Sequence, residues 1–429
     1  MSQIPFSSLT LQSELIDNLV TLGYHSMTPI QQHSLPHILE GRDVVAQGKT
    51  GSGKTAAFGL GLLNKLNVKR FRIQSLVLCP TRELADQVAT EIRRLARGIH
   101  NVKVLTLCGG VPFGPQVGSL EHGAHIIVGT PGRIDDHLRR GTLKLADVDM
   151  LVLDEADRML EMGFQEVLNE IIEQIPTQRQ TLLFSATFPA EIEAIAQHIM
   201  QQPVMAQLES THDNLSISQH FFLVDESQRV NGVRRLLAYY QPESTVIFCN
   251  TKREVQQLAD ELSDYGYAAL PLHGDLEQKD RDQTLVRFMN KSASILVATD
   301  VASRGLDIDA LDGVINYHIA REIEVHVHRI GRTGRAGNKG IACTLFSENE
   351  RYKLQRLAEF LGQEISAEAL PDKKLLDQPP LQPAMATLQI DGGKKQKLRP
   401  GDILGALTGE NGIAGELFWF IVCSRRGRT

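Results

Sequence analysis

The sequence is poor in cysteine and aromatic residues, has no long hydrophobic run and carries no excess of positive charge. Its five cysteines are far apart and form no CxxC pair, so neither a disulfide framework nor a paired-cysteine zinc site is indicated. Its apolar runs are far shorter than the ~20 residues that cross a bilayer, so no membrane partner is expected. Residues 1–8 carry no basic segment followed by an apolar one, as a signal peptide would. These absences predict a cytoplasmic protein.

The formal net charge of −6 argues against a globally basic nucleic-acid binder. The 42% hydrophobic and 22% charged residues are typical of a globular protein, and 429 residues favour two or three domains. From Ala384 onward, however, seven lysines and arginines stand against four acidic residues. Because local charge decides phosphate binding, a nucleic-acid partner stays open.

Short β-branched runs alternate with helix-like stretches along most of the chain, which predicts an α/β fold with parallel sheets. A polar stretch near residue 210 separates two sets of runs, so we expect domains at 1–208 and 209–370. Prolines in 371–383 predict a semi-rigid linker, and 384–429 forms a short third segment. The first set of runs lies at 44–46, 75–79, 102–107, 125–128, 150–153 and 181–184, and the second at 219–224, 245–249, 268–272, 294–298, 313–317 and 342–346.

A glycine-rich loop, GKTGSGKT at 48–55, follows the first predicted strand and precedes a helix-like stretch. This is the context of a phosphate-binding loop, whose backbone N–H groups face the phosphates of a nucleotide. Lys54 is expected to reach the β and γ oxygens, and Thr55 to bind Mg²⁺. A plain turn with an exposed lysine is disfavoured by the full match. The candidate nucleotide-binding residues here are Gly48, Thr50, Gly51, Gly53, Lys54 and Thr55.

Two carboxylates, Asp154 and Glu155, emerge directly from the apolar run at 150–153. Asp154 is expected to hold Mg²⁺ through water, and Glu155 to position and deprotonate the attacking water. Taken alone, the pair could simply begin and cap the next helix. Beside a phosphate loop, the catalytic interpretation is favoured.

Three motifs together resemble those of the DEAD-box RNA helicases of superfamily 2. They are Asp154-Glu155-Ala156-Asp157, Ser185-Ala186-Thr187 and the run from His328 to Arg335, and the resemblance covers roughly 6–350. It implies two RecA-like domains and an ATP-dependent RNA helicase that separates short duplexes locally. ATP and RNA would bind cooperatively, closing the domains around one bent strand, without translocation.

The resemblance also assigns roles outside the phosphate loop. Gln31 would read the adenine edge and Phe6 would stack on the base, while Asp307 would bind the ribose. Arg332 and Arg335 would stabilise the charge of the transferred phosphate, as positive groups brought in from outside do. His328 would tie the second domain to the catalytic carboxylates. Asp157, Ser185 and Thr187 would couple the state of ATP to strand separation, although a hydroxyl pair at a strand end can also cap a helix.

Further clusters are RNA contacts by the same resemblance. They offer hydroxyls, backbone N–H groups or arginines, which suit a sugar-phosphate backbone and read no base. Each is weak alone, since Thr-Pro-Gly-Arg is also a common turn, but they follow predicted strands in order. Hydroxyl contacts to the 2′-OH would select RNA over DNA. The candidates are Thr81, Arg82, Gly109, Gly110, Thr130, Arg133, Thr251, Gln278, Arg281 and Thr299.

One position departs from the common family pattern, because His326 stands where a tyrosine is usual. His326 and His328 lie close in sequence and could suggest a metal site, but no third ligand is evident. We therefore interpret His326 as a packed side chain.

The C-terminal segment predicts a strand at 384–391, a basic loop at 392–399 and a helix at 400–407. It resembles the RRM-like domain with which the bacterial DbpA subfamily binds a hairpin of 23S rRNA, which implies large ribosomal subunit precursors as partners. Forty-six residues are too few for its four-stranded sheet, so we expect an incomplete α+β segment. The candidate phosphate contacts are Lys394, Lys395, Lys397 and Arg399, with a solvated loop as the alternative.

Two rival functions remain beside a monomeric RNA helicase. An ATP-gated RNA clamp or assembly scaffold would bind RNA without unwinding it. A DNA helicase is disfavoured by the glutamine motif around Gln31.

Overall fold

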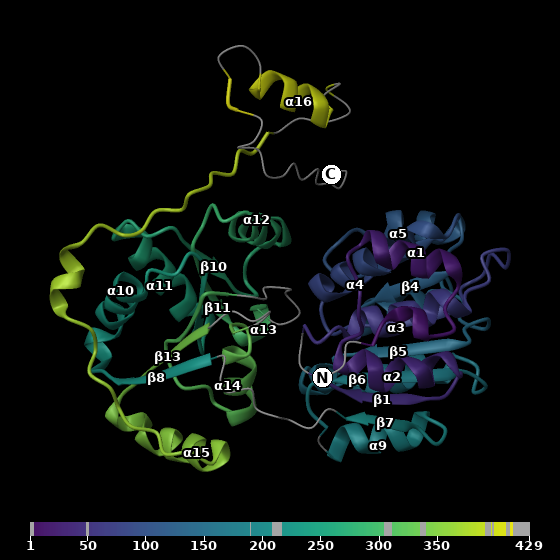
Figure 1. Ribbon diagram of the computed structural model, residues 1–429, viewed down its shortest axis with the longest axis horizontal. Coiled ribbons are helices and arrows are strands. Elements are labelled where there is room, and N and C mark those ends of the chain that lie inside the picture. The colour runs from purple at the N-terminus through teal and green to yellow at the C-terminus, as the bar shows by residue number, and fades with distance from the viewer. Residues whose placement is uncertain are drawn as a thin grey trace. The chain divides into compact units, whose positions relative to one another are not determined.

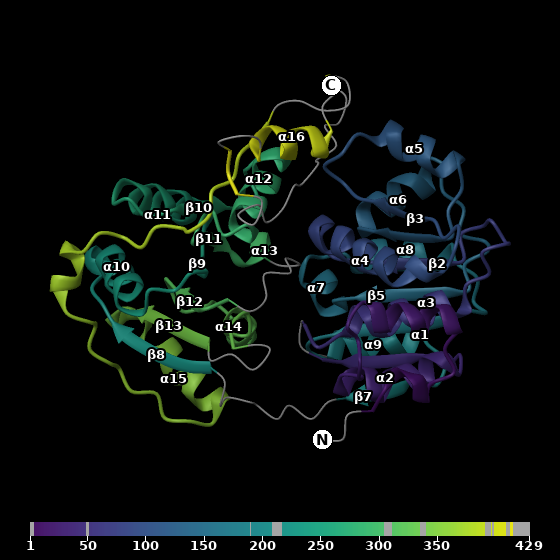
Figure 2. The same cartoon turned by 45° about the horizontal axis from the view of Figure 1, so that its top comes forward.

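The computed structural model describes residues 4–48, 51–188, 190–207, 217–303, 311–334, 340–390, 396, 399–408 and 412–414. The chain divides near residue 211 into two compact units. Each unit is built on one parallel β-sheet with helices on both faces (Figures 1 and 2). The predicted α/β class, with two RecA-like domains, is confirmed.

The first unit has a seven-stranded sheet in the order β3-β4-β2-β5-β6-β1-β7, and every pair is parallel. Side chains of one strand alternate between two buried clusters, as Val77 and Leu78 of β2 show. Such two-sided burial is typical of parallel sheets. The strands are β1 (Val44–Gln47), β2 (Ser75–Leu78), β3 (Val104–Leu107), β4 (Ile126–Gly129), β5 (Met150–Asp154), β6 (Gln180–Ser185) and β7 (Val204–Gln207).

Two groups of helices cover this sheet. The cluster on one face includes buried side chains of α1 to α4, and the cluster on the other face includes those of α6 to α9. The helices are α1 (Ser13–Thr21), α2 (Pro29–Leu39), α3 (Lys54–Lys65), α4 (Arg82–Leu95), α5 (Phe113–Glu121), α6 (Pro131–Arg139), α7 (Ala156–Glu161), α8 (Gln165–Glu173) and α9 (Ala190–Ile199).

The second unit has a six-stranded parallel sheet in the order β10-β11-β9-β12-β13-β8. Its strands are β8 (Ile217–Leu223), β9 (Thr245–Cys249), β10 (Ala269–Leu272), β11 (Ile295–Thr299), β12 (Gly313–Asn316) and β13 (Gly340–Phe346). Its helices are α10 (Arg229–Tyr240), α11 (Lys252–Asp264), α12 (Gln278–Met289), α13 (Asp300–Ser303), α14 (Ile323–Ile330) and α15 (Arg351–Leu361).

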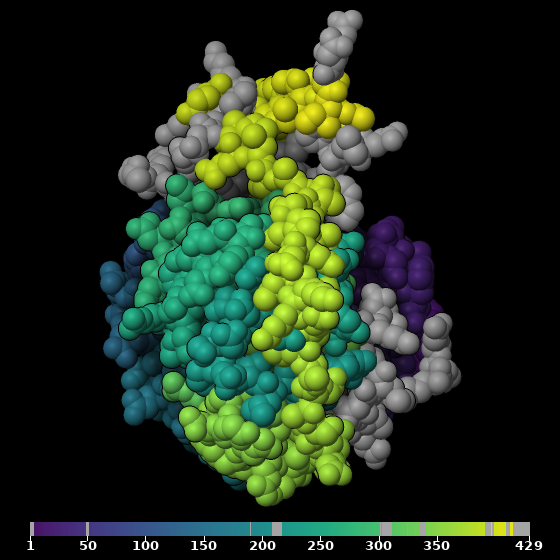
Figure 3. All heavy atoms as spheres, turned by 90° about the vertical axis from the view of Figure 1, so that its left-hand side faces the viewer, coloured from purple at the N-terminus to yellow at the C-terminus, as the bar shows by residue number. Residues whose placement is uncertain are grey.

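Residues 362–390, which we call the strap, run along the surface of the second unit (Figure 3). The strap contains a short 3₁₀ helix, Lys373–Asp377, which contacts α10. Arg235 of α10 donates to the carbonyl oxygens of Leu370 (3.0 Å) and Pro371 (2.5 Å). Gln382 donates to the carbonyl of Gly266 (3.0 Å). The segment expected to be a linker is therefore held at several points.

The strand expected at 384–391 is not formed over 384–390, where the described backbone is irregular and mostly exposed. A strand needs a neighbouring strand for its N–H and C=O groups, and no strand pairing involves the described residues 384–390. The expected helix is present as α16 (Pro400–Leu407). Within the described residues, no helix has both the length and the apolar character needed to cross a membrane.

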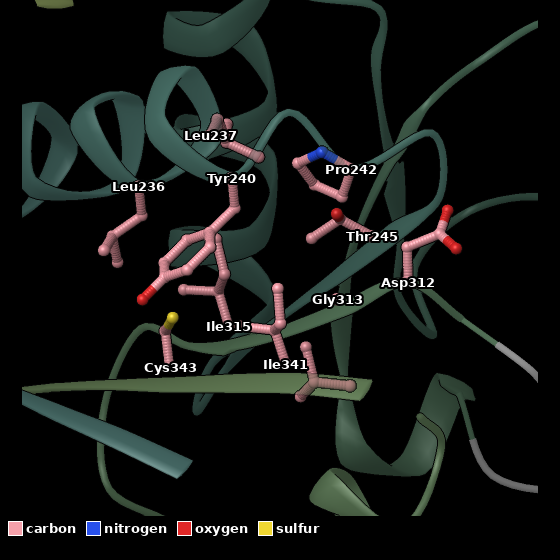
Figure 4. A pocket seen from close by; sticks show the side chains of 11 residues that line it. Leu236, Leu237, Tyr240, Pro242, Thr245, Asp312, Gly313, Ile315, Ile341 and Cys343 are labelled. Carbon is pink, nitrogen blue, oxygen red and sulfur yellow. The ribbon is translucent and has the colours of Figure 1, made fainter. Parts of the chain in front are cut away.

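A small, mostly apolar cavity lies between α10 and the sheet of the second unit (Figure 4). Thr245, Gly313 and Ile341 line it, and each stands at the beginning of its strand or one residue inside it. Ligands of open parallel sheets bind at the opposite, carboxyl edge. The cavity is therefore a packing defect at the back of the sheet and not a candidate for the functional site.

Candidate functional site

The strand order of the first sheet sorts the predicted functional residues into two neighbouring groups at its carboxyl edge. The phosphate loop, Asp154 and Ser185 follow β1, β5 and β6, which are adjacent. The predicted RNA-binding residues follow β2, β4 and β3, which are also adjacent. Since β5 pairs with β2, the two groups lie next to each other along one edge, although their residues alternate in sequence.

The phosphate loop is held in an open turn before α3. Gly53 is the N-cap of α3 with a φ of 93°, a left-handed conformation that favours glycine. A Cβ there would lie 2.5 Å from Nε2 of Gln31, so only glycine fits. The Thr28 hydroxyl donates to the carbonyl of Ser52 (2.7 Å) and Gln31 Nε2 to that of Gly53 (3.0 Å). These bonds turn two loop carbonyls toward α2.

Several buried polar atoms around this loop have no hydrogen-bond partner among the described residues. They are Ser52 Oγ, Lys54 Nζ and Ser185 Oγ. Lys54 is only 6% exposed, and leaving a buried ammonium group unpaired is costly. A site with unsatisfied donors at a helix N-terminus fits the phosphate groups of a nucleotide.

The two predicted catalytic carboxylates end β5 in a buried position, with Asp154 2% and Glu155 5% exposed. Glu155 has a φ of 52°, a strained conformation for a non-glycine residue, and its N–H donates to Asp154 Oδ1 (3.1 Å). Burial raises the pKa of Asp154 to about 7, although the charge of Lys54 opposes the shift. A cation bound at this edge would favour the ionised carboxylate.

Asp157 joins the carboxylate turn to the Ser-Ala-Thr segment. Its Oδ2 accepts hydrogen bonds from the backbone N–H groups of Ala186 (3.2 Å) and Thr187 (2.9 Å) and from the Thr187 hydroxyl (2.9 Å). Burial alone would raise the pKa of Asp157, but these bonds and the charges of Lys54 and Arg158 lower it. Asp157 and Thr187 are thus in direct contact. The backbone carbonyl of Ser185 accepts from the N–H of Gly48 (3.0 Å), which joins the end of β6 to the start of the phosphate loop.

The residues expected to bind the base take different positions. Gln31 is 2% exposed, and its amide already bonds the N–H of Thr28 (2.9 Å) and the carbonyl of Gly53. One N–H and one lone pair of this amide remain for a base. Phe6 is 3% exposed and packs edge-on against Tyr24 with ring centroids 6.4 Å apart, so it is part of the core in this structure.

The predicted RNA-binding residues of the first unit occupy the turns that follow β2, β3 and β4. Thr81 caps α4 by accepting from Leu84 N–H (3.3 Å), and Arg82 pairs with Asp86 at 3.6 Å. Gly109 has open space where a Cβ would stand, and Gly110 has a φ of 72°. Thr130 is the N-cap of α6.

Arg133 differs from the others, because it points into the protein. It donates to the carbonyl of Val111 (3.1 Å), and its side chain is 14% exposed.

In the second unit, the predicted RNA-binding residues lie at the carboxyl ends of three adjacent strands, β10, β11 and β9. Thr251 caps α11 in a capping box with Glu254, and its side chain is exposed. Thr299 ends β11 and accepts weakly from Ala302 N–H (3.4 Å). Gln278 begins α12, where Arg281 also lies. Of these four, Thr251 is exposed, Gln278 and Arg281 are partly exposed, and Thr299 is 9% exposed.

The motif expected to act on the transferred phosphate lies on α14 and the turn after it. His328 is half-buried and Arg332 is 7% exposed, and the carbonyl of Arg332 accepts from Leu311 N–H (3.2 Å). Six of the predicted site residues, namely Thr50, Asp307, Arg335, Lys394, Lys395 and Lys397, lie outside the described residues.

Sequence reasoning missed Arg329, which organises this part of the second unit. Its buried guanidinium pairs with Asp300 through two bonds (2.6 and 2.7 Å), and it also donates to Asn250 (3.0 Å) and to the carbonyl of His318 (3.0 Å). These partners follow β11, β9 and β12 at the carboxyl edge. Arg329 follows His328 in a run of charged residues, and nothing in that run indicated that the Arg329 side chain is buried and joins the ends of three strands.

Comparisons with known proteins agree with this arrangement. The model of the DEAD/DEAH box helicase family matches residues 28–195, that of the helicase conserved C-terminal domain 228–337, and that of the DbpA RNA binding domain 387–419. The ATP-dependent RNA helicase DbpA of Escherichia coli is 53% identical over 411 residues, which cover 96% of this chain and 90% of the relative.

Two further similarities extend over the helicase units. The DEAD-box ATP-dependent RNA helicase CshA of Geobacillus kaustophilus is 44% identical over 353 residues, 82% of this chain and 75% of the relative. The structure of Saccharomyces cerevisiae Dbp5 bound to RNA and ADP BeF3 aligns with a TM-score of 0.75 at 27% identity, covering 87% of this chain and 98% of that one.

A parallel sheet with a phosphate loop, a buried carboxylate pair and a second unit of the same class defines an ATP-hydrolysing helicase. The chain belongs to the DEAD-box RNA helicases and is of the DbpA type. It binds RNA and uses ATP, as the helicase resemblance predicted.

Proposed function

We propose that the carboxyl edge of the first sheet holds ATP and Mg²⁺ in one half and the RNA backbone in the other. The order β3-β4-β2-β5-β6-β1 supports this proposal, because it collects each predicted group into neighbouring turns. Asp157, bonded to Thr187, stands on the ATP side and contacts the segment after β6.

In the half of this edge that binds the nucleotide, a few groups have separate roles. The loop that begins at Gly48 offers the backbone N–H groups that follow this glycine, whose own N–H is bonded to Ser185. Lys54 pairs with the phosphates, and Thr55 with Asp154 would hold Mg²⁺. Magnesium needs only one or two protein ligands when phosphates complete its shell, so a larger ligand cluster is not required. The ion supplies charge neutralisation on the phosphates. Glu155 then orients and deprotonates the attacking water.

The second unit completes the reaction and the RNA site in this proposal. Arg332, Arg335 and His328 act on the phosphate, and Asp307 holds the ribose. Thr251, Thr299, Gln278 and Arg281 add contacts to the RNA backbone beside those of the first unit. Gln31 reads the edge of the adenine base, and Phe6 stacks on the base once it leaves its packing against Tyr24. Ser185, Thr187 and Asp157 couple hydrolysis to strand separation.

We further propose that the RNA target is 23S rRNA in precursors of the large ribosomal subunit. The match of 387–419 to the DbpA RNA binding domain supports this target. Lys394, Lys395, Lys397 and Arg399 would contact its phosphates. We propose that the protein acts as a cytoplasmic monomer; the cysteines at 79, 108, 249 and 343 are free and buried, which suits a reducing compartment.

ATPase activity of the full chain tests this proposal with three additions, which are no RNA, an unrelated RNA, and a 23S rRNA fragment with the hairpin that the DbpA subfamily binds. We expect the ribosomal fragment to stimulate most strongly. Glu155→Gln should lower the stimulated rate about 10²- to 10⁴-fold, as loss of a general base does. Equal stimulation by both RNAs would contradict the 23S target, and none by either would contradict the RNA-dependent mechanism.

A duplex-separation assay under the same conditions distinguishes a helicase from an RNA clamp. A helicase releases the shorter strand of a labelled duplex when ATP is hydrolysed. A clamp would hold the RNA without turning over the bound ATP and without releasing a strand.

A further inference from the structure

A buried chain of hydrogen bonds joins two of the turns proposed to bind RNA. The Gln116 side chain of α5 donates from Nε2 to the carbonyl of Cys108, the residue before Gly109 (2.9 Å). Its Oε1 lies 3.1 Å from Nε2 of His137 on α6, the helix that begins with the Thr130 turn. Gln116 is 7% and His137 0% exposed, so water does not compete for these bonds.

The orientation of the Gln116 side-chain amide determines which atom donates and which accepts in each of these hydrogen bonds. Since Gln116 Nε2 donates to Cys108, its Oε1 must accept, and His137 must carry a proton on Nε2. Burial lowers the pKa of His137, and the charges of Arg133 and Arg140 lower it further, which keeps the ring neutral. Nδ1 is then an acceptor, and the Thr142 hydroxyl shares its one proton between Nδ1 (2.8 Å) and the carbonyl of His137 (3.1 Å). Both ring nitrogens of His137 and both polar atoms of the Gln116 amide therefore have a partner.

A second brace runs beside the first. The Phe113 ring stacks on the His137 ring with centroids 4.2 Å apart and planes at 19°. The guanidinium groups of Arg140 (4.4 Å) and Arg133 (5.6 Å) lie over the Phe113 ring. Arg133 also bonds the carbonyl of Val111, two residues after Gly109. The turn after β3 is therefore tied to α6 on both sides of its glycine pair.

We propose that Gln116 and His137 are positioning residues for RNA binding, which hold the Gly109–Gly110 turn and the Thr130–Arg133 turn in a fixed relative position. This inference rests on the proposed RNA site, and it adds residues that do not themselves touch RNA. A phosphate backbone has a regular spacing, so two turns bind it together only when their distance is preset. The β3–β4 pairing fixes the strand ends, and the buried chain of hydrogen bonds fixes the two turns beyond those ends.

The variants Gln116→Met and His137→Phe test the proposal. Methionine keeps the length of the side chain and removes both hydrogen bonds, while phenylalanine keeps the stack on Phe113 and removes the bond to Gln116. We expect each to raise the RNA concentration for half-maximal ATPase about tenfold. The rate at saturating RNA and the KM for ATP should stay within about twofold, because the nucleotide half is untouched.

Gln74→Met is the matched control. Gln74 is 3% exposed, and its Nε2 donates to the carbonyls of Asn67 (2.9 Å) and Arg70 (2.7 Å), so it is the same kind of buried loop brace. It precedes β2, at the opposite edge of the sheet. We expect a similar fall in Tm but a half-saturating RNA concentration within about twofold of wild type.

The double variant Gln116→Met/His137→Phe adds a second test. If both residues act through one bond, it should shift half-saturation no further than the larger single change. Half-saturation that rises equally in the control, or in none of the variants, would overturn the positioning role. Should Gln116→Met fail to fold, His137→Phe still decides between these outcomes. A wild-type ATPase that RNA does not stimulate would instead overturn the proposed RNA site itself.

Discussion

His326 shows how one buried side chain can make a domain sensitive to acid. It is 1% exposed, and neither ring nitrogen has a hydrogen-bond partner among the described residues. Its ring stacks on Phe221 with centroids 6.2 Å apart. Burial, with the charge of Arg329, lowers the pKa of His326 to about 3. The folded second unit therefore holds the neutral ring over the whole physiological range.

We predict that, because of His326, the free energy of unfolding of the second unit decreases as the pH is lowered. The unfolded ring has a pKa of ~6.5, so the unfolded state takes up a proton first. Stability is complete above pH ~6.5 and is lost as pH falls toward 3, by ~1.4 kcal/mol per pH unit at most. His326→Phe fills similar space and cannot be protonated. Its Tm should exceed that of wild type, by a margin that grows between pH 7 and pH 5.

Thermal unfolding of both proteins at pH 7, 6 and 5 measures this margin. His100→Asn, a change at an exposed histidine, is the control and should follow wild type. A constant margin across this range would show that His326 does not titrate as stated.

At the scale of elements, Arg229 links α10 to the strands beneath it. Its side chain is 1% exposed and donates to Glu350 at 2.5 Å and to Glu226 at 2.7 and 3.0 Å. It also donates to the backbone carbonyl of Tyr317, just after β12. One cation thus joins the N-terminal end of α10, the end of β12 and the segment that begins α15.

We predict that Arg229→Met lowers the free energy of unfolding of the second unit by about 3–5 kcal/mol. The substitution removes the nearest partner of Glu350, whose side chain is 11% exposed, and leaves only Lys353 (3.4 Å) and His318 (3.8 Å) beside it. Urea unfolding gives the loss, and hydrogen exchange should place it in β12, β13 and α10. Arg351→Met removes an exposed pair with Glu348 (2.7 Å) and should leave the transition unchanged. An equal effect of both changes would contradict the buried brace.

For the molecule as a whole, the contacts of the strap fix the point on the second unit from which the C-terminal segment extends. Its bonds to Arg235 and to the carbonyl of Gly266 are supplemented by His220 with Glu368 (2.9 Å) and by the hydroxyls of Ser292 and Thr387 (2.5 Å). A segment held at several points has little freedom to move its end. The RNA-binding segment therefore starts from a defined place on the second unit.

We predict that Arg235→Gln releases part of the strap. Trypsin should then cut after Lys373 or Lys374 about tenfold faster, because proteolysis follows the population of the open state. Arg234→Gln is the matched control; it also removes one tryptic site, but Arg234 lies over Tyr265 (3.6 Å) instead of bonding the strap. Equal cutting rates in the two variants would show that Arg235 does not hold the strap.

The α/β class, the phosphate loop and the carboxylate pair could be predicted from the amino-acid sequence alone, because their signals lie in short runs of adjacent residues. Sequence reasoning missed β7, whose four residues include only one that is buried, and it predicted a strand at 384–391 where the described residues 384–390 have no strand conformation. The roles of the candidate site residues stay predictions. These roles depend on which residues lie close together in space, and a local sequence pattern does not specify such contacts.

Which turns lie next to each other could be learned only from the folded structure. The order β3-β4-β2-β5-β6-β1-β7 interleaves distant parts of the chain, and this brings Asp157 to Thr187 and Gln116 to His137. The structure also shows that Arg329, a charged residue of a sequence motif, is buried and bonded to Asp300. Hydrophobic periodicity is local, whereas the pairing of strands and the matching of buried polar groups are long-range. That physical difference separates what could be inferred from the sequence from what required the fold.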